Sequence, residues 1–166
     1  SRFVDAPSDI PRLHSAAPGV HQYEAHIKGL RSDAVYYYSI LDFLTPVIGG
    51  NERHQFRTAP DPGNDDRPLR FWVVGDSGDG SVGQFESYQG FQSYLENEPA
   101  PTRKPVDACI HVGDMAYGQG TDEQFQKKFF NPYKQTLRQT VCWASMGNHE
   151  GQTSNGLKGT GPFFDA

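Results

Sequence analysis

Three short apolar runs of this chain each end in a glycine that is followed by a side chain carrying oxygen. The runs are Leu69 to Asp76 (LRFWVVGD), Val106 to Tyr117 (VDACIHVGDMAY) and Val141 to Glu150 (VCWASMGNHE). Apolar runs of this length, rich in Val, Ile and Trp, favour strands that are buried on both faces. A glycine at the end of such a strand lets the backbone turn without a side chain in the way. The pattern therefore predicts three parallel strands of one α/β sheet.

The side chains that follow these glycines are Asp76, Asp114 and Asn148. Tyr117 lies three residues after Asp114, and His149 follows Asn148 directly. Parallel α/β sheets bind their ligands at the carboxyl ends of the strands, so these side chains are expected to converge at one edge. Carboxylate, amide and imidazole groups suit hard or borderline metal ions. One such aspartate alone would more simply cap a helix, but the repeated pattern predicts a metal site.

Helical segments are predicted between the three strands. Ser81 with Gln84, and Thr121 with Gln124, have the spacing of capping boxes. Apolar residues at helical spacing follow each cap, namely Phe85, Tyr88, Phe91 and Leu95 after the first and Phe125 and Phe129 after the second. Pro132 is expected to interrupt the second helix. The order is therefore βαβαβ, with right-handed crossovers.

The first part of the chain has a different pattern. Residues 21–27, 34–41 and 54–58 have strand-like composition and are separated by turn residues, which favours a β-sandwich. The stretch APDPGNDDRP that follows is typical of a linker. We therefore predict a β domain at residues 1–60, a linker at 61–68 and a second domain at 69–166.

Several polar and sulfur-containing residues are predicted to be structural. His14, His21, His26 and His54 are expected at the surface or in turns. His111 is expected to pack or to form a hydrogen bond behind the ligands, and Asp79 to cap a loop. Cys109 and Cys142 lie in predicted strands; two packed, reduced thiols are favoured over a disulfide, whose geometry is demanding between neighbouring parallel strands.

Charge and hydropathy exclude two classes of partner. The net charge is −5 and no Lys/Arg cluster occurs, which argues against electrostatic binding of nucleic acid. No stretch has the length of a membrane span, so no membrane partner is expected. Neither feature fixes the oligomeric state.

In this order, the motifs GDSG, GDMAY and GNHE resemble the first three metal-site motifs of the calcineurin-like metallophosphoesterases. The tyrosine of the second motif resembles a purple acid phosphatase. The segments GLRSDAVYYY and HQFRTAP resemble the end of the fibronectin type III-like domain that precedes the catalytic domain of plant-type purple acid phosphatases. The implied fold class is α/β: a partial parallel-sheet metallophosphoesterase domain, preceded by part of a fibronectin type III-like β-sandwich.

The resemblance implies an acid phosphatase that hydrolyses phosphate monoesters with a dinuclear metal site and a metal-bound hydroxide. Asp114 would bridge the two metals, Asp76 and Tyr117 would hold the first, and Asn148 would hold the second. A tyrosine ionises near pH 10 when free, so Tyr117 as a ligand favours Fe(III), accompanied by Zn, Mn or Fe as the divalent ion. A secreted or extracytoplasmic location is expected from the family.

The same resemblance assigns catalytic roles to two residues of the third motif. His149 would contact the phosphate or protonate the leaving oxygen, and Glu150 would orient its imidazole. The further histidines of the family's site do not occur after Glu150. We therefore expect a piece of a longer phosphatase that, by itself, binds metal weakly and turns over slowly. The alternatives are a divalent-metal phosphodiesterase or nucleotidase of the same superfamily, and a non-catalytic β-sandwich binding module.

Overall fold

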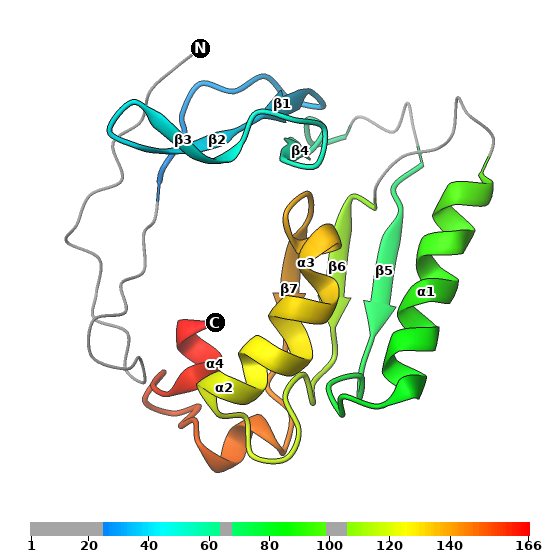
Figure 1. Ribbon diagram of the computed structural model, residues 1–166, viewed down its shortest axis with the longest axis vertical. Helices are drawn as coiled ribbons and strands as arrows, with labels where there is room; N and C mark the ends of the chain where they lie inside the picture. Colours follow the sequence, from blue (N-terminus) through cyan, green and yellow to red (C-terminus); the bar gives the residue numbers. More distant parts are fainter. Residues whose placement is uncertain (1–24, 64–67, 99–105) are drawn as a thin grey trace.

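The computed structural model describes residues 25–63, 68–98 and 106–166 (Figure 1). A parallel sheet is formed by β5 (Phe71–Val74), β6 (Ala108–His111) and β7 (Val141–Ala144), in that spatial order. Cys109 of β6 is the register partner of Trp72 in β5 and of Cys142 in β7. The predicted parallel α/β sheet is confirmed, and its strands end at the same edge.

The first crossover is α1 (Val82–Asn97), and the second runs through α2 (Asp122–Phe125), the π-helical η1 (Gln126–Phe130) and α3 (Asn131–Leu137). The three parallel strands follow one another in chain order. Right-handed crossovers between such strands place both helical crossovers on the same face of the sheet. The helices cover that face, as Figure 1 shows.

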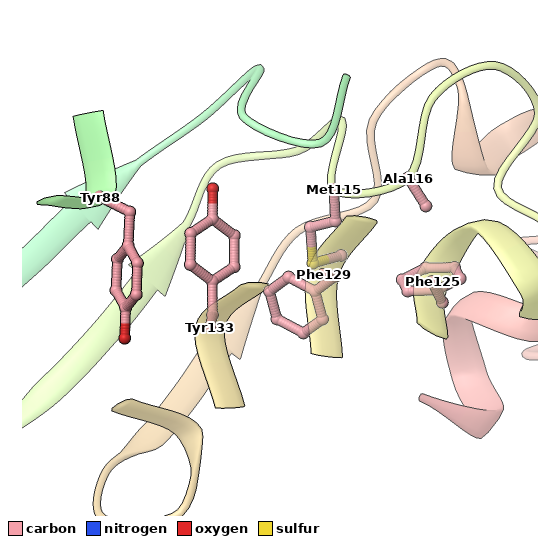
Figure 2. Packing of buried hydrophobic residues seen from close by; sticks show 6 residues of the cluster. All are labelled: Tyr88, Met115, Ala116, Phe125, Phe129 and Tyr133. Atoms are coloured by element: carbon pink, nitrogen blue, oxygen red, sulfur yellow. The ribbon is translucent and has the colours of Figure 1, made fainter. Parts of the chain in front are cut away.

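The core lies between this face and the helices. The Trp72 ring stacks on Phe91 of α1 with centroids 4.4 Å apart, and meets Tyr133 of α3 edge to face at 5.3 Å. The cluster of buried apolar residues consists of Tyr88, Met115, Ala116, Phe125, Phe129 and Tyr133 (Figure 2). Met115 and Ala116 belong to the loop that follows β6. The loop that carries Asp114 is thus anchored in the core by its own apolar side chains.

Both predicted helix caps are present. Ser81 is the N-cap of α1, and its hydroxyl accepts from the Gln84 N–H at 3.3 Å. The Gln84 side chain accepts from the N–H of Gly80 instead of returning to Ser81. Thr121 and Gln124 form the full reciprocal capping box.

The predicted interruption at Pro132 is confirmed in part, because α2 ends at Phe125 and a second α-helical segment, α3, begins at Asn131. Pro132 lies in the first turn of α3, and the helical path passes through it because the preceding turn, Gln126–Phe130, widens to π-helical form. Proline has no N–H to close an α-helical turn, and a π-helical turn accommodates the mismatch. Chain direction is therefore kept, and Phe129 and Tyr133 both reach the core.

Phe85 does not join the predicted apolar stripe of α1, since 59% of its surface is exposed. It precedes Phe91 by six residues, which places it about 120° away around a helix of 3.6 residues per turn. Tyr88 and Phe91 therefore contact the sheet, and Phe85 faces away from the core.

The second face of the sheet is bare within the described residues. Large apolar side chains point from it to solvent, namely Phe71, Val73, Val141 and Trp143. The prediction that these strands are buried on both faces is therefore met on one face only. Cys109 and Cys142, on the covered face, are free thiols with Sγ atoms 3.3 Å apart, as predicted.

The N-terminal part contains two small antiparallel sheets. β1 (Val35–Tyr37) pairs with β4 (Gln55–Arg57), and β2 (Ser39–Asp42) pairs with β3 (Thr45–Gly49). The predicted strand over 34–41 is thus split at Tyr38. β3 was not predicted, because Pro46 cannot donate a ladder hydrogen bond and lowers strand propensity.

Two further N-terminal predictions concern the strand over residues 21–27 and the histidines. The predicted strand over 21–27 is partly outside the described residues, and residues 25–27 are not in a strand. His54 lies in a turn, as one of the two predicted alternatives has it, because its N–H donates to the Asn51 carbonyl at 3.0 Å; its side chain is buried at 7% exposure, with the ring edge-on to Tyr38 at 5.6 Å. His26 is exposed, as expected, and His14 and His21 lie outside the described residues.

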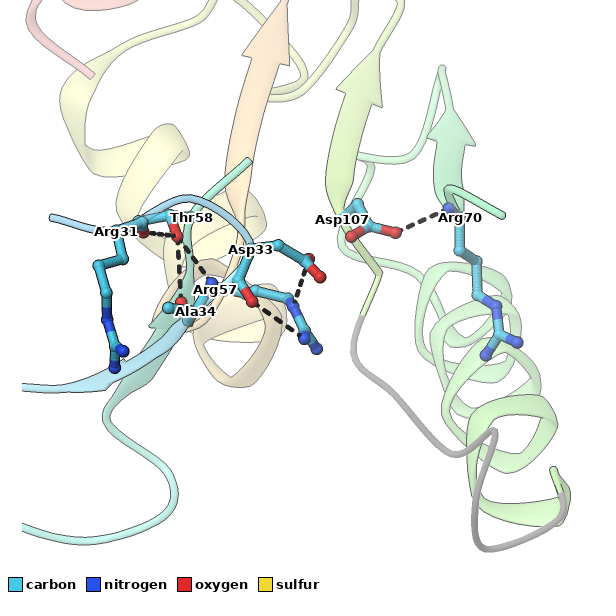
Figure 3. A network of polar contacts seen from close by, with 7 residues as sticks. All are labelled: Arg31, Asp33, Ala34, Arg57, Thr58, Arg70 and Asp107. Carbon is cyan, nitrogen blue, oxygen red and sulfur yellow. Dashed lines mark hydrogen bonds and ion pairs between the residues drawn. The ribbon is translucent and has the colours of Figure 1, made fainter. Parts of the chain in front are cut away.

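Polar contacts join the segment before β1 to β4 and to the residue that follows it (Figure 3). The Arg57 guanidinium donates to the Asp33 carboxylate at 2.9 Å, and the Thr58 hydroxyl donates to the Arg31 carbonyl at 2.7 Å. The Tyr38 hydroxyl also donates to the Arg138 carbonyl at 2.9 Å. The N-terminal part therefore contacts the turn between α3 and β7, at the end of the parallel sheet where its strands begin and opposite the predicted metal site (Figure 1).

The domain boundaries stay predictions.

Among the described helices, none combines the length and the apolar character required to cross a lipid bilayer.

Candidate metal centre

Asp76 and Asp114 both lie in left-handed backbone conformation at the ends of β5 and β6. Their φ angles are 50° and 57°, a region that residues other than glycine rarely adopt. The two loops are hydrogen bonded to each other, because the Asp76 N–H donates to the Gly113 carbonyl at 3.1 Å and the Gly78 N–H to the Asp114 carbonyl at 3.2 Å. Strained backbone that the surroundings hold in place is a feature of functional sites. The fold thus places two carboxylates side by side.

Tyr117 reaches the same place from the loop after β6. Its hydroxyl donates to Asp76 Oδ1 at 2.9 Å, and its N–H donates to the Gly78 carbonyl at 3.0 Å. The peptide bond from Tyr117 to Gly118 is cis. The Tyr117 ring packs against the His149 imidazole with centroids 4.1 Å apart. The spacing of three residues after Asp114 therefore brings the phenol to Asp76.

The environment of Tyr117 keeps its phenol protonated. Burial, then the hydrogen bond to Asp76 and the negative charges of Asp76 and Asp114, raise the pKa of Tyr117 above its ordinary value. A cation between these groups would act in the opposite direction, because positive charge favours the phenolate. Ligation by Tyr117 therefore requires a strongly Lewis-acidic ion.

His149 lies at the end of β7 and is held by backbone contacts. Its N–H donates to Asp114 Oδ1 at 3.1 Å, and its Nδ1 lies 2.7 Å from the Gly118 carbonyl. A carbonyl only accepts, so Nδ1 carries the proton and Nε2 is the ring nitrogen that remains for a substrate. Gln152 also donates to the Gly118 carbonyl, at 3.3 Å.

Glu150 does not orient the imidazole, contrary to the expectation. Its carboxylate accepts hydrogen bonds from the backbone N–H groups of Asp114, Ala116 and Gly147. The carbonyl of Gly118 makes the contact to His149 that was expected of Glu150. A backbone carbonyl carries no signal in the sequence, so this partner could not have been predicted.

Asn148 is exposed, and its place beside the other three residues follows from its position between Gly147 and His149. Hydrogen bonds join Asp76 to Tyr117 and Asp114 to His149. Asp76, Asp114 and Tyr117 thus lie at one edge of the sheet, and Asn148 follows β7 at the same edge.

Two predicted structural roles are confirmed beside this edge. His111 is 1% exposed; its Nδ1 accepts from the Gly113 N–H at 3.3 Å, so its Nε2–H donates to the Ser77 hydroxyl at 2.9 Å. Burial lowers the pKa of His111, against the opposing charges of Glu150, Asp76 and Asp114. Asp79 accepts from the Ser81 N–H at 2.8 Å, as a capping residue does.

A buried polar chain behind the site was missed by the sequence analysis. The Tyr133 hydroxyl donates to the Ser77 carbonyl at 3.2 Å and accepts from the Gln84 side chain at 3.1 Å. The backbone next to Asp76 is thereby fixed to α1 and α3. No local pattern predicts these contacts of Tyr133, because its partners are brought together only by tertiary packing.

The donor set fits a hard metal ion in part. It contains two carboxylates, a phenol and an amide, which are oxygen donors of the kind that such ions prefer. Over the ranges that the structure describes, no group of three or more His, Cys, Asp or Glu side chains is arranged to hold a metal ion. The set is therefore oxygen-rich and lacks imidazole ligands.

The contact between Gly147 and Asp114 predicts a sensitive position. A Cβ at residue 147 would collide with the carboxyl group and the N–H of Asp114, whereas a Cβ at Gly151 would meet no atom within 4 Å. Gly147→Ala is expected to destabilise the fold by about 1–3 kcal/mol and to weaken metal binding, because Asp114 must move. Urea unfolding and metal titration check this. Gly151→Ala is the matched control, and equal effects of the two substitutions would contradict the assigned contact.

The model of the calcineurin-like phosphoesterase family matches residues 69–165, a range that includes the whole parallel sheet and the candidate site. The chain belongs to the calcineurin-like phosphoesterase family. Members of this family are generally hydrolases, and they typically bind two metal ions. No curated protein and no solved structure that was compared matches the chain. This calcineurin-like phosphoesterase is thus assigned as a metal-dependent phosphoesterase.

Proposed function

We propose that this phosphoesterase is an acid phosphatase of the purple type, which hydrolyses phosphate monoesters with Fe(III) and a divalent ion (Zn, Mn or Fe). The single observation that supports this choice within the family is the contact of the Tyr117 hydroxyl with Asp76 at 2.9 Å. A phenol beside a carboxylate at a strand end can become a phenolate ligand of a strongly acidic metal.

The residues that would hold the metals follow from the site. Asp76 and Tyr117 would bind the first ion, Asp114 would bind both, and Asn148 would bind the second. When bound, these ions would supply Lewis-acid chemistry, which polarises a phosphoryl oxygen and makes a water more acidic. Because Asp76 and Asp114 are fixed by their own loop contacts, the chain provides preorganised carboxylates for this pair.

The role left to His149 is toward the substrate. The Gly118 carbonyl holds Nδ1–H, and the Tyr117 ring packs against the imidazole, so the ring has a fixed orientation. Nε2 can then donate to a phosphate oxygen or give a proton to the leaving oxygen. Glu150 has no direct part in this step, because its carboxylate binds backbone N–H groups.

We also propose that the N-terminal sheets are part of a fibronectin type III-like β-sandwich. Two antiparallel pairs separated by short turns support this, although such a sandwich needs about 100 residues in full. A secreted location goes with this proposal.

One observation favours a second candidate, a divalent-metal phosphodiesterase or nucleotidase. The Tyr117 hydroxyl donates to Asp76 Oδ1 at 2.9 Å, and this is a contact that only the neutral phenol can make. Two divalent ions would leave this phenol protonated. The substrate would then be a diester or a nucleotide.

Metal loading and spectroscopy separate the two candidates. The protein is loaded with Fe(III) and Zn²⁺ or Mn²⁺, its metals are quantified, and hydrolysis of p-nitrophenyl phosphate is compared with that of bis(p-nitrophenyl) phosphate. We expect a visible charge-transfer band that Tyr117→Phe removes and that Tyr94→Phe, at an exposed tyrosine, leaves unchanged. A colourless protein that prefers the diester would support the second candidate, and a protein that binds no metal would contradict both.

A further inference from the structure

Glu150 is a buried carboxylate between two loops of the candidate metal centre. It begins η2 (Glu150–Gln152) and has 0% of its surface exposed. Oε2 accepts from the N–H groups of Asp114 and Gly147, both at 2.9 Å, and Oε1 accepts from the N–H of Ala116 at 2.9 Å. A buried ionised carboxylate is costly unless hydrogen bonds satisfy it, and bonds to backbone N–H groups are of the strong, charge-assisted kind.

These three N–H donors come from two different loops. Asp114 and Ala116 follow β6, whereas Gly147 follows β7 and precedes Asn148. One side chain therefore holds together the loops that carry three of the four proposed metal ligands. The contacts also flank the left-handed backbone of Asp114, whose φ is 57°. Conformations of this kind persist where the surroundings fix them from several sides.

The neighbouring packing leaves Glu150 little freedom to move. A Cβ at Gly120 would lie 2.5 Å from the Glu150 Cα, so the loop after β6 packs directly against its backbone. The Ser154 N–H donates to the Glu150 carbonyl at 2.9 Å. These two contacts fix the backbone of Glu150, and the fixed backbone keeps the carboxylate in position to accept from the three N–H groups.

We propose that Glu150 is a positioning residue that sets the metal affinity of the centre by fixing the backbone of Asp114 against that of Gly147. This rests on the proposed metal-dependent function. Glu150 acts through Asp114 and the loop before Asn148, and it touches neither substrate nor metal. The role differs from orientation of the His149 imidazole, which belongs to the Gly118 carbonyl.

The substitution Glu150→Gln tests the proposal with little change in shape. One oxygen becomes an NH₂ group, which has no acceptor function, so at least one backbone N–H loses its partner. We expect Mn²⁺ and Zn²⁺ affinity to fall about 10- to 100-fold, the range found when groups that support metal ligands are removed. Excess metal should restore turnover, because the loss is in affinity. Glu123→Gln is the matched control, since Glu123 is exposed and pairs with Lys127.

Amide NMR of the metal-free protein supplies a readout that does not depend on activity. The amide protons of Asp114, Ala116 and Gly147 should be shifted downfield and protected from exchange in the wild type, and Glu150→Gln should abolish this for at least one of them. Unprotected amides in the wild type would overturn the inference even if the variant does not fold. Lost amide signals with unchanged metal affinity would overturn it as well. A wild type with protected amides that binds no metal would instead count against the proposed function.

Discussion

Replacement of Asp114 by asparagine is expected to lower metal affinity and phosphatase turnover by more than about 100-fold while the fold is kept. The amide oxygen can still accept from the His149 N–H, which the Asp114 carboxylate does at 3.1 Å. The negative charge is lost, however, and an amide is a poorer bridge between two cations than a carboxylate. Calorimetric titration with Mn²⁺ and an assay with p-nitrophenyl phosphate measure the two effects.

Asp79→Asn is the control for this substitution. Asp79 lies three residues after Asp76 and is exposed. An asparagine at this position still has a side-chain oxygen that can accept from the Ser81 N–H, as Asp79 does. Metal affinity and turnover should stay within about twofold of the wild type, as is usual for surface changes away from a site. If Asp114→Asn were equally harmless, Asp114 would not be a metal ligand, and the proposed centre would fail.

Phe125→Ala is expected to cost about 3–5 kcal/mol of unfolding free energy, the range for deletion of a buried phenyl group. Phe125 is 2% exposed and contacts the rings of Phe129 and Phe130. It ends α2 directly before the π-helical turn, so the cavity would loosen the packing under the loop of Met115 and Ala116. Urea unfolding followed by circular dichroism measures the change.

Phe85→Ala makes the same chemical change on the exposed side of α1. Because 59% of Phe85 is exposed, its loss should change the unfolding free energy by no more than about 0.5 kcal/mol. The prediction for Phe125 is contradicted if the two substitutions have similar effects. Such a result would mean that the cluster around Tyr133 does not carry the stability of the domain.

Local chemistry in the sequence was sufficient for several features. The apolar runs predicted β5, β6 and β7 and their parallel order, because periodicity and flanking glycines act within a few residues. The caps at Ser81 and Thr121 were predicted for the same reason, since their partners lie three residues away. The spacing of Tyr117 after Asp114 also placed both residues at one strand end.

Contacts between distant segments were beyond this local information. Glu150 was expected to orient His149, but it binds backbone N–H groups 34 and 36 residues earlier in the chain. His54 was expected at the surface or in a turn; it lies in a turn, and its burial against Tyr38 follows from the folding of the N-terminal sheets. The partners of Glu150 and of His54 leave no periodic signal in the sequence, because these contacts depend on which segments the fold brings together.

The sequence by itself determined the strands, their order and the oxygen-bearing residues that follow them, because these depend on short-range hydrophobic pattern and turn chemistry. Only the tertiary structure decided that Asp76 meets Tyr117, that Gly118 holds His149 and that Glu150 joins the loops after β6 and β7. The physical reason is that hydrogen bonds to backbone groups are specified by the meeting of loops in space, and a backbone N–H or carbonyl is the same in every sequence.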